Sequence, residues 1–439
     1  MTEDTNTNTN TLRPPTTRSR TSSVGQFTLG DMGPGLSTMA ATEAQIRGSK
    51  KRQRALSKGS IGGQEGEVVP GAEGEAVEKI GVGSWAWMRF RETCYQKTWV
   101  APLILLLIPL IAFGLSSDKS DANWLYGMIF ASYKLEPEYE GGPPMYGKGR
   151  NDFLFVAYYT VVLSFIREFT MQQVLEPLAR WNGLKKEAKV KRFMEQTYFI
   201  LYDGVMGPWG LYIMHHMPLW YFETRPLYEV PHRTHELDFK MYYLLQAAFW
   251  TQQAIVLMLQ LEKPRKDFKE LVLHHIVTIA LIFCSYRFHF TWIGIEVYIT
   301  MDVSDLALAT SKTLNYLNHW LTAPFFIVFM GVWIYMRHYL SLKILWSVAT
   351  EFRTVGDFVL NWETQQYKCW ISQYITFALL FALQLLNLYW LFLVFRIAFR
   401  LVFNDTLKDE RSDDDDDDEE EEEKKKPEPA KSAEEKKTE

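Results

Sequence analysis

The chain has 439 residues, of which 47% are hydrophobic, and a formal net charge of -5 at pH 7. That charge is misleading, because an uninterrupted acidic run from Asp413 to Glu423 outweighs it and leaves the rest of the chain net positive. The three cysteines, Cys94, Cys284 and Cys369, form no paired pattern and no metal-ligand spacing, so we infer no disulfide framework.

Both ends of the chain are predicted to be disordered tails. Residues 1–80 are rich in Thr, Asn, Ser and Gly and lack apolar periodicity, so burial cannot offset the entropy of ordering. Residues 406–439 are acidic and then Lys-rich, a solvated composition. No basic, apolar and small-residue series opens the sequence, so we expect no cleavable signal peptide and expect the first span to target the protein.

Between the tails, near-continuous apolar runs with aromatic ends predict transmembrane helices. The runs are about 99–115, 152–176, 197–219, 239–261, 270–288, 291–313, 319–336 and 371–400. The pattern predicts an all-α, polytopic membrane protein with about eight transmembrane helices. We assign 81–150 to the first span and the loop that follows it, and 151–405 to the main transmembrane domain.

Basic residues predict the orientation of the spans. They cluster at 47–54 before the first span, at 185–192 between the second and third, and at 263–269 between the fourth and fifth. With eight spans these segments share one side, which the positive-inside rule makes cytosolic. Both termini are then cytosolic, and loops 116–151, 220–238 and 337–370 face the lumen.

Two histidines and two aspartates lie inside consecutive apolar stretches. His275 lies 15 residues before Phe290 and Asp305 lies 15 residues after it, and His274 and Asp302 are close by. If the two stretches form a hairpin that turns near Phe290, all four lie at similar depth, where ionisable groups are costly and indicate function. Asp302 and Asp305 project from one helix face, so imidazole and carboxylate are expected to meet.

Three interpretations of these four residues stay open from their spacing. They are structural hydrogen-bonding groups, ligands of a metal, or an acyl-transfer site. A metal is disfavoured because adjacent residues on a helix point about 100° apart. Acyl transfer needs an imidazole that attacks a thioester or deprotonates an amine, and a carboxylate that fixes its tautomer.

The wider sequence resembles the longevity-assurance motif of ceramide synthases, which belong to the TLC-domain family. The resemblance rests on Arg265-Lys266-Asp267, His274-His275, Val277-Thr278-Ile279, Ser285-Tyr286, Met301-Asp302-Val303-Ser304-Asp305 and Ser311-Lys312-Thr313-Leu314-Asn315-Tyr316. It extends over about 150–400 and includes Arg337-His338-Tyr339 and residues 361–370, which resemble the fungal branch that prefers very-long-chain acyl groups.

The resemblance implies that the protein transfers a fatty acyl group from acyl-CoA, as co-substrate and without a cofactor or metal, to the amine of a sphingoid base. It implies that His274, His275, Asp302 and Asp305 are catalytic, and that spans two to eight enclose a lipid-accessible cavity. We favour a covalent acyl-histidine over direct attack, with His274 as its preferred site. The main alternative is a TLC protein that binds lipids or chaperones membrane segments without catalysis. A transporter is less favoured, because no internal repeat is visible.

The resemblance also implies an endoplasmic-reticulum location and partners. These are membrane lipids, a second copy or a paralogue in a dimer, and a small single-span accessory subunit, with no nucleic acid. The C-terminal Lys436 and Lys437 resemble a dilysine retrieval signal.

Further residues are weaker candidates. Gln246, Trp250 and Gln253 share one helix face and either bond a neighbouring helix or line the lipid tunnel, and Ser285 and Tyr286 are candidate substrate contacts. The cytosolic cations Lys263, Arg265, Lys266 and Lys269 are candidate contacts for the phosphates of CoA. Kinase-type patterns mark Ser23, Ser57 and Ser412 as phosphorylation sites.

Overall fold

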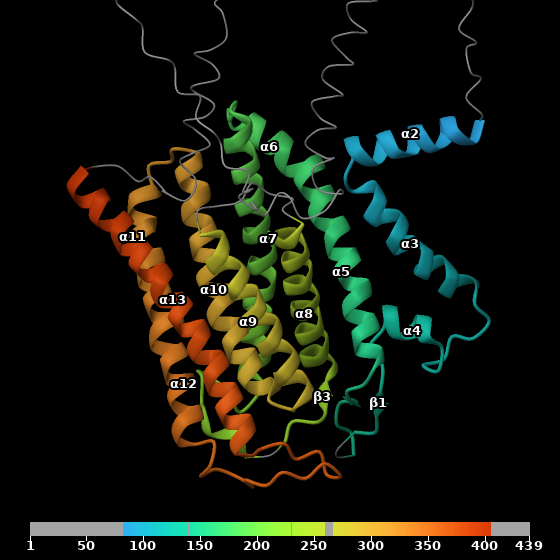
Figure 1. Cartoon of the computed structure of the whole chain (residues 1–439), viewed down its shortest axis with the longest axis vertical. Coiled ribbons are helices and arrows are strands. Elements are labelled where there is room, and N and C mark those ends of the chain that lie inside the picture. Colours follow the sequence, from blue (N-terminus) through green and yellow to red (C-terminus); the bar gives the residue numbers. More distant parts are fainter. Residues whose placement is uncertain (1–81, 138–139, 230, 260–266, 405–439) are drawn as a thin grey trace, which may run out of the picture. The chain divides into compact units, whose positions relative to one another are not determined.

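Long helices run side by side in the part of the chain that a computed structural model describes, residues 82–404 without 138–139, 230 and 260–266 (Figure 1). All of these residues belong to one compact unit, Ile80–Glu439. The two predicted disordered tails, 1–80 and 406–439, lie outside the described residues. The end of the bundle that holds α6 in Figure 1 is called the upper end, and the end that holds the β-strands is called the lower end.

A helix occupies the position of every predicted span, which confirms the mostly helical fold. In chain order these helices are α3 (Val100–Leu115), α5 (Asn151–Thr170) continued by η2 (Met171–Leu175) and α6 (Glu176–Trp181), α7 (Glu187–His215), α8 (Leu237–Met258), α9 (Phe268–Arg287), α10 (Thr291–Tyr316), α11 (Thr322–Ile334) continued by η4 (Tyr335–Leu340) and α12 (Ser341–Thr350), and α13 (Trp370–Asn404).

Four of these helical segments are long and apolar enough to cross a membrane by length and composition. They are Asn151–Trp181, Phe268–Arg287, Thr322–Thr350 and Trp370–Phe403. The helices α7, α8 and α10 do not pass the same test, because they carry charged and polar side chains that the bundle buries, such as Asp203, Lys240 and Asp302. The mean hydropathy of such a helix is lower than that of its lipid-facing neighbours, although its polar face is turned toward the inside of the bundle.

The predicted bounds of the seventh span, 319–336, were too short. The loop predicted to follow it, 337–370, therefore began too early in the sequence. The helix continues through the π-helical segment η4 and through α12 to Thr350. Arg337, which marked the expected end of the span, is only 3% exposed and lies inside the bundle. The charge of the Arg337 guanidinium is paired inside the bundle, so it does not prevent the helix from continuing.

The first span is preceded by a helix that the sequence did not predict, α2 (Val82–Gln96). The segments Trp87–Gln96 and Val100–Leu115 meet at an angle of 110°, and α2 lies beside the upper end of the bundle and extends away from it in Figure 1. None of the residues of α3 is buried. The first span therefore lies at the edge of the bundle, along α5, as its position before the main domain suggested.

Loops and short strands close the lower end. The strands β1 (Lys134–Leu135), β2 (Met145–Tyr146) and β3 (His235–Glu236) pair antiparallel in that order, and the short helices α4 (Trp124–Ile129) and η3 (Arg225–Tyr228) belong to the same loops. The fully buried Lys240 donates to the carbonyl oxygens of Ser132, at 2.9 Å, and Gly147, at 2.8 Å, and pairs with Asp152 at 2.8 Å. The paired and hydrogen-bonded ammonium group of Lys240 thus joins these loops to the start of α5 and α8.

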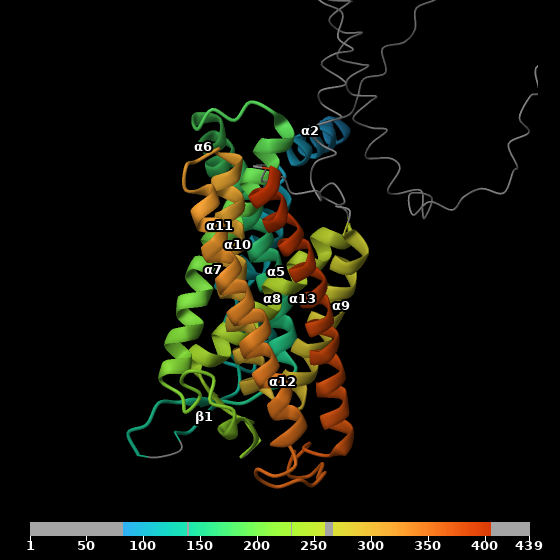
Figure 2. The same cartoon turned by 90° about the vertical axis from the view of Figure 1, so that its left-hand side faces the viewer.

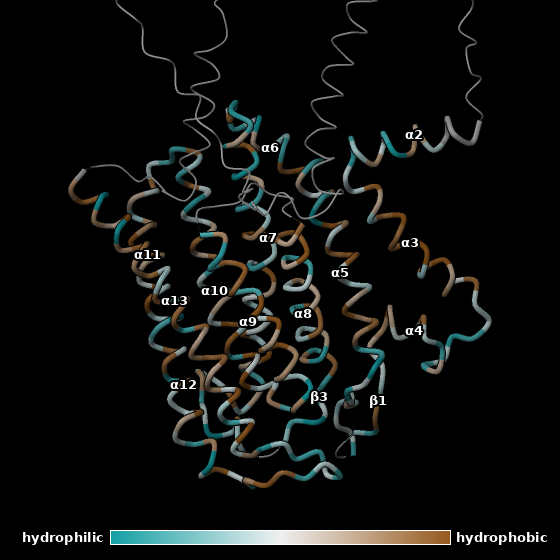
Figure 3. The backbone as a smooth tube through the Cα atoms, in the orientation of Figure 1, coloured by the Kyte–Doolittle hydropathy of each residue, from teal (hydrophilic) through white to brown (hydrophobic). Residues whose placement is uncertain are grey.

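The helices form a closed arrangement in which α9 lies between α8 and α13, and α10 packs against α7 on one side and α11 on the other (Figures 1 and 2). Hydrophobic residues predominate in the middle of the helices, and hydrophilic residues are more frequent toward the two ends (Figure 3). The main core cluster contains Leu163, Met214, Tyr242, Ile299 and Val348, from five different helices. This packing leaves the polar side chains of α8, α9 and α10 facing one another.

Candidate functional site

The two histidines lie on α9, toward the upper end of the bundle, and α10 returns beside it after a short turn. The turn consists of residues 288–290, so the hairpin predicted near Phe290 is confirmed. His274 is 6% exposed and His275 is 7% exposed, and their ring centroids are 5.4 Å apart. Both histidines are therefore withdrawn from the surface at the same level.

Two tryptophans enclose the histidines. The ring of Trp250, on α8, meets His274 at 5.6 Å and His275 at 6.0 Å between centroids, in edge-to-face geometry. Trp390, on α13, meets His274 at 5.3 Å from another side. Rings packed in this way limit the rotation of the imidazoles and keep water away from them.

The two imidazoles differ in their hydrogen bonds. Nδ1 of His275 is 2.9 Å from the carbonyl oxygen of Leu271, one helical turn earlier, so Nδ1 carries the proton and Nε2 is the basic nitrogen. Nδ1 of His274 is buried and has no hydrogen-bond partner in the described part of the chain. His274 therefore keeps a nitrogen that no protein group occupies.

Asp302 is held from the side of α8. One of its carboxylate oxygens accepts hydrogen bonds from Nε2 of Gln246 and, at 3.2 Å, from the hydroxyl of Tyr242. Tyr202, on α7, in turn donates to Oε1 of Gln246 at 3.3 Å. Asp302 itself is 2% exposed, so this chain of neutral donors is what satisfies the buried carboxyl group.

Asp305, one helical turn farther along α10, is held by a cation instead. NH2 of Arg337 is 2.5 Å from its Oδ1, while Nε of the same guanidinium donates to Ser304 at 2.6 Å and NH1 donates to Asn387 at 3.3 Å. Arg337 lies in η4, and a π-helical turn in a longer helix is frequent at functional sites. The turn places the guanidinium against α10 and α13 at once.

The direct contact expected between imidazole and carboxylate is absent among the described residues. Neither histidine makes a hydrogen bond or ion pair with Asp302 or Asp305, since Gln246 and Arg337 occupy these carboxylates instead. Three of the four residues nevertheless share a cavity, which Asp302 does not line. His274, His275 and Asp305 line one cavity of about 180 Å³, together with Trp250, Arg337 and Trp390.

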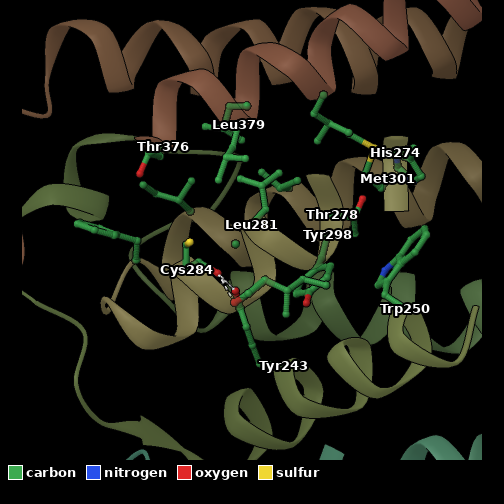
Figure 4. Close-up of a pocket in the computed structure, with 18 residues that line it drawn as sticks. Tyr243, Trp250, His274, Thr278, Leu281, Cys284, Tyr298, Met301, Thr376 and Leu379 are labelled. Atoms are coloured by element: carbon green, nitrogen blue, oxygen red, sulfur yellow. Dashed lines mark hydrogen bonds between the residues drawn. The ribbon is translucent and has the colours of Figure 1, made fainter. Parts of the chain in front are cut away.

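A second, narrower cavity of about 60 Å³ begins at His274 and continues toward the lower end between α9, α10 and α13. Its walls are mostly apolar, with Leu281, Ile293 and Leu383 among them. Figure 4 shows this cavity with Trp250, His274 and Met301 at one end and Cys284 and Thr376 toward the other. His274 and Trp250 line both cavities and so stand at their junction.

The predicted substrate contacts are divided among three places. Trp250 and Gln253 line the polar cavity, and Ser285 lines the apolar one, where it is hydrogen-bonded to Tyr243. Gln246 makes the helix-to-helix bond to Asp302 that was weighed as its structural role. Tyr286 faces away from the histidines and donates to Asp152 at 2.8 Å.

Most of the other candidates cannot be placed. Lys269 is exposed at the start of α9, whereas Lys263, Arg265 and Lys266 lie outside the described residues, as do Ser23, Ser57 and Ser412. Among the described residues, no group of three or more His, Cys, Asp or Glu side chains is arranged to hold a metal ion.

Two supporting residues were not assigned a role from the sequence. Arg337 was noticed only as part of a motif, although a lone arginine in an apolar stretch was itself a signal. Tyr242 gave no signal, because a tyrosine in an apolar helix is common and its hydroxyl finds Asp302 only after α8 and α10 have packed.

Comparisons with known proteins show the family of the chain. A family model described as TLC domain matches residues 192–396. The chain is 47% identical over 398 residues to sphingosine N-acyltransferase LAG1 of Saccharomyces cerevisiae strain YJM789, covering 90% of this chain and 92% of that protein. It is 50% identical over 319 residues to sphingosine N-acyltransferase lac1 of Schizosaccharomyces pombe, covering 72% of this chain and 81% of that protein. A ceramide synthase of Caenorhabditis elegans, hyl-1, is 27% identical over 53% of this chain and 63% of that protein.

Proposed function

The chain belongs to the TLC-domain family, in the group of the fungal sphingosine N-acyltransferases, and we propose that it is itself a ceramide synthase that transfers a long-chain or very-long-chain acyl group from acyl-CoA to the amine of a sphingoid base. The observation that carries the proposal is the position of His274 at the junction of a polar and an apolar cavity. An acyl thioester likewise has a polar part and an apolar part, because its long apolar chain ends at a polar, reactive carbonyl group.

We propose that the acyl chain occupies the apolar cavity between α9, α10 and α13, and that CoA enters through the polar cavity. Lys312 lines the polar cavity, and Lys269 lies on the exposed start of α9, so positive charge lies near the proposed entrance. In this pose the thioester carbonyl lies beside His274.

The chemistry proposed is a double displacement. A nitrogen of His274 attacks the thioester carbonyl, the carbon–sulfur bond breaks, and CoA leaves as the thiol with the imidazole proton. The amine of the sphingoid base then attacks the acyl-imidazole, and the amine proton returns to the imidazole as the amide forms. Nε2 of His275 is placed as a basic nitrogen for this second step, because the Nδ1 proton of His275 is donated to Leu271.

Turnover by the purified protein with acyl-CoA and sphinganine tests the proposal. We expect Ala at His274, His275, Asp302 or Asp305 to remove most of the turnover, and the double variants to be little worse than the single ones. His319→Ala and Asp121→Ala, both exposed, are matched controls that should keep wild-type rates. If the wild-type protein bound lipids but released no CoA, the non-catalytic alternative would hold.

Intact mass measurement separates the covalent route from direct attack. Protein incubated with acyl-CoA and no amine should gain the mass of one acyl group, and peptide mapping should locate it on His274. Absence of the adduct from protein that is competent in turnover would support attack in a ternary complex, with histidine as general base only.

We further propose that the protein is a multi-pass protein of the endoplasmic-reticulum membrane that crosses it eight times, with both termini and the histidine end of the bundle in the cytosol. The basic clusters and the even number of spans support this topology. Tags before Arg47 and after Glu439 should be digested by protease in sealed microsomes, and a tag within 120–145 should be protected. A protected C-terminal tag would reverse the assignment of the last span.

The remaining expectations are also proposals. They are a dimer with a second copy or a paralogue, a small accessory subunit, and phosphorylation of the tails at Ser23, Ser57 and Ser412. Since the tails lie outside the catalytic bundle in this scheme, Ala at all three serines should change activity in cells while leaving the acyl-chain profile of the purified enzyme unchanged.

A further inference from the structure

A third cavity, of about 430 Å³, lies on the opposite side of α9 from the cavities at His274. Helices α5, α8 and α9 form its walls, and the residues before α5 and after α9 form its floor at the lower end of the bundle. The face of α9 that carries Ile279, Phe283 and Tyr286 turns toward this cavity, whereas the face that carries His274, Thr278 and Leu281 turns toward the apolar catalytic cavity. We name it the α5–α9 cavity.

The α5–α9 cavity is separate from the proposed acyl cavity. The hydroxyl groups of Tyr243 and Ser285 are hydrogen-bonded to each other between α8 and α9, and Tyr243 and Ile282 contribute to the walls of both cavities. These side chains lie between the two cavities, and His274 does not line the α5–α9 cavity.

The floor of the α5–α9 cavity carries more positive than negative charge. Lys148, Arg150 and Arg287 line it, with Asp152 as the acidic group. Burial lowers the pKa of Lys148 well below its usual range, so the two arginines are the permanent cations of the floor. The carboxylate of Asp152 is already occupied, because it pairs with Lys240 at 2.8 Å and accepts hydrogen bonds at 2.8 Å from both Tyr286 and the backbone N–H of Gly149. Among the described residues, the two arginines of the floor therefore have no ion pair with a carboxylate in the cavity.

His289 adds a buried imidazole to the cavity. Its side chain is 6% exposed and lines the cavity, and Nζ of Lys148 lies 3.3 Å from its Nδ1. With Lys148 as the donor, Nδ1 accepts and the proton is on Nε2. Nε2 is buried without a hydrogen bond of good geometry among the described residues, and Gln365, which also lines the cavity, is a hydrogen-bonding neighbour of this imidazole. Cations beside a buried N–H donor form a site for an oxyanion.

The walls above this floor are apolar and open to the surroundings of the bundle. Val156, Ala247 and Ile279 line the cavity from the three helices. At its edge stand Phe153 and Phe283, which are 60% and 50% exposed and whose ring centroids are 6.3 Å apart. In a membrane these exposed rings meet lipid chains, so the cavity is accessible from the bilayer.

We propose that the α5–α9 cavity binds one glycerophospholipid with a net negative headgroup. The phosphate lies at Lys148, Arg287 and His289, and one acyl chain runs along the apolar walls between α5 and α9. A sphingoid base does not fit, because its cationic amine would meet the surplus of positive charge. A zwitterionic phospholipid fits less well, because its cationic end has no free carboxylate to meet.

Native mass spectrometry of the full-length protein, stripped of lipid and offered equal amounts of dioleoyl phosphatidylglycerol and dioleoyl phosphatidylcholine, tests the proposal. Wild-type protein should retain one phosphatidylglycerol with a preference of about tenfold, the scale of one charge-assisted hydrogen bond. Arg287→Gln should remove most of that preference. Arg225→Gln is the matched control, since Arg225 is another exposed arginine of the lower end but does not line the cavity.

A second variant tests the apolar part of the site without changing its charge. Val156→Trp fills the space between α5 and α9 and should lower the retention of both lipids, while a thermal melt reports whether the protein is folded. Equal retention of the two lipids by the wild type, or unchanged preference in Arg287→Gln, would overturn the proposal. An equal loss in Arg225→Gln would also overturn it, because it would indicate attraction by the whole surface rather than a site.

Discussion

The edge and the face of the Arg337 guanidinium are both in contact with other side chains. It pairs with Asp305, donates to Ser304 and Asn387, and lies over the ring of Trp333, with 4.1 Å from Cζ to the ring centroid. None of these contacts reaches the expected position of the substrate's acyl chain, so we regard Arg337 as a positioning residue that fixes Asp305 at the edge of the polar cavity.

A double-mutant cycle tests this role. Arg337→Gln leaves the partly buried Asp305 without its ion-pair partner and should cost about 1.5–3 kcal/mol of stability, whereas Arg337→Gln with Asp305→Asn removes both charges and should recover part of it. Turnover should stay low in the single and the double variant, because Asp305 is then misplaced or absent. Arg225→Gln, which breaks an exposed pair with Glu229, should change stability by less than about 1 kcal/mol.

Recovery of turnover together with stability in the double variant would show that Arg337 and Asp305 are structural only. The conservative change Arg337→Lys gives a second measure. Lysine keeps the charge but loses the fork that reaches Ser304 and Asn387, so it should hold stability better than Arg337→Gln while kcat falls more than KM rises.

The sequence located the residues of the site but not their partners. The positions of His274, His275, Asp302 and Asp305 follow from the cost of polar groups in apolar helices, a local property that a single sequence displays. Which donor meets which carboxylate depends on how α8 and η4 pack against α10. Asp302 therefore turned out to face Gln246 rather than a histidine, which spacing along one hairpin does not reveal.

At the scale of elements, α7 supports the site through a glycine. A Cβ added at Gly210 would come within 2.6 Å of the hydroxyl of Tyr242 and 2.9 Å of Ile299. The same hydroxyl is the one that donates to Asp302. The close approach of α7 to α8 and α10 thus depends on the missing side chain.

Gly210→Ala should displace Tyr242, cost about 1–3 kcal/mol of stability and lower kcat, because the carboxylate of Asp302 loses a donor. Gly204→Ala is a control on the same helix, since nothing lies within 4 Å of the Cβ that it would add. It should leave turnover unchanged and stability equal or slightly higher. Thermal melts and initial rates of both variants provide the comparison, and equal behaviour of the two would contradict the proposed support.

Element prediction succeeded where hydropathy was continuous and failed where tertiary contacts decide. The helices α5, α9 and α13 follow directly from their apolar runs. The extension of the seventh span past Arg337 did not, because the sequence alone cannot show that a charge is neutralised by Asp305. The strands of the lower end are two residues long and carry no periodicity from which to predict them.

At the scale of the molecule, loops from distant parts of the chain meet at the lower end and bury several histidines. His232 stacks on Trp292 with 3.6 Å between ring centroids, and Nζ of Lys148 donates to the carbonyl oxygen of His232 at 2.9 Å. Burial, aided by the nearby charge of Lys148, lowers the pKa of His232 to about 3, and burial lowers the pKa of His289 to about 3 as well. Both histidines are therefore neutral in the folded protein at every ordinary pH.

This neutrality predicts the direction in which stability changes with pH. An unfolded histidine takes up a proton below a pH of about 6.5, whereas the folded one does not until the pH approaches the lowered pKa. The unfolded state therefore binds more protons between these values, and stability is lost as the pH falls through that window. Each histidine of this kind contributes at most about 1.4 kcal/mol per pH unit.

His232→Phe should keep the ring stack on Trp292 and remove the titration, so its stability should fall less steeply than that of the wild type between about pH 6.5 and 5. Thermal melts of the detergent-purified protein across this range measure the slope. His319→Phe, which changes an exposed histidine at the opposite end of the bundle, should retain the wild-type slope. If His232→Phe and the wild type lost stability in parallel as the pH fell, His232 would not be the buried neutral group that couples the lower-end loops to pH.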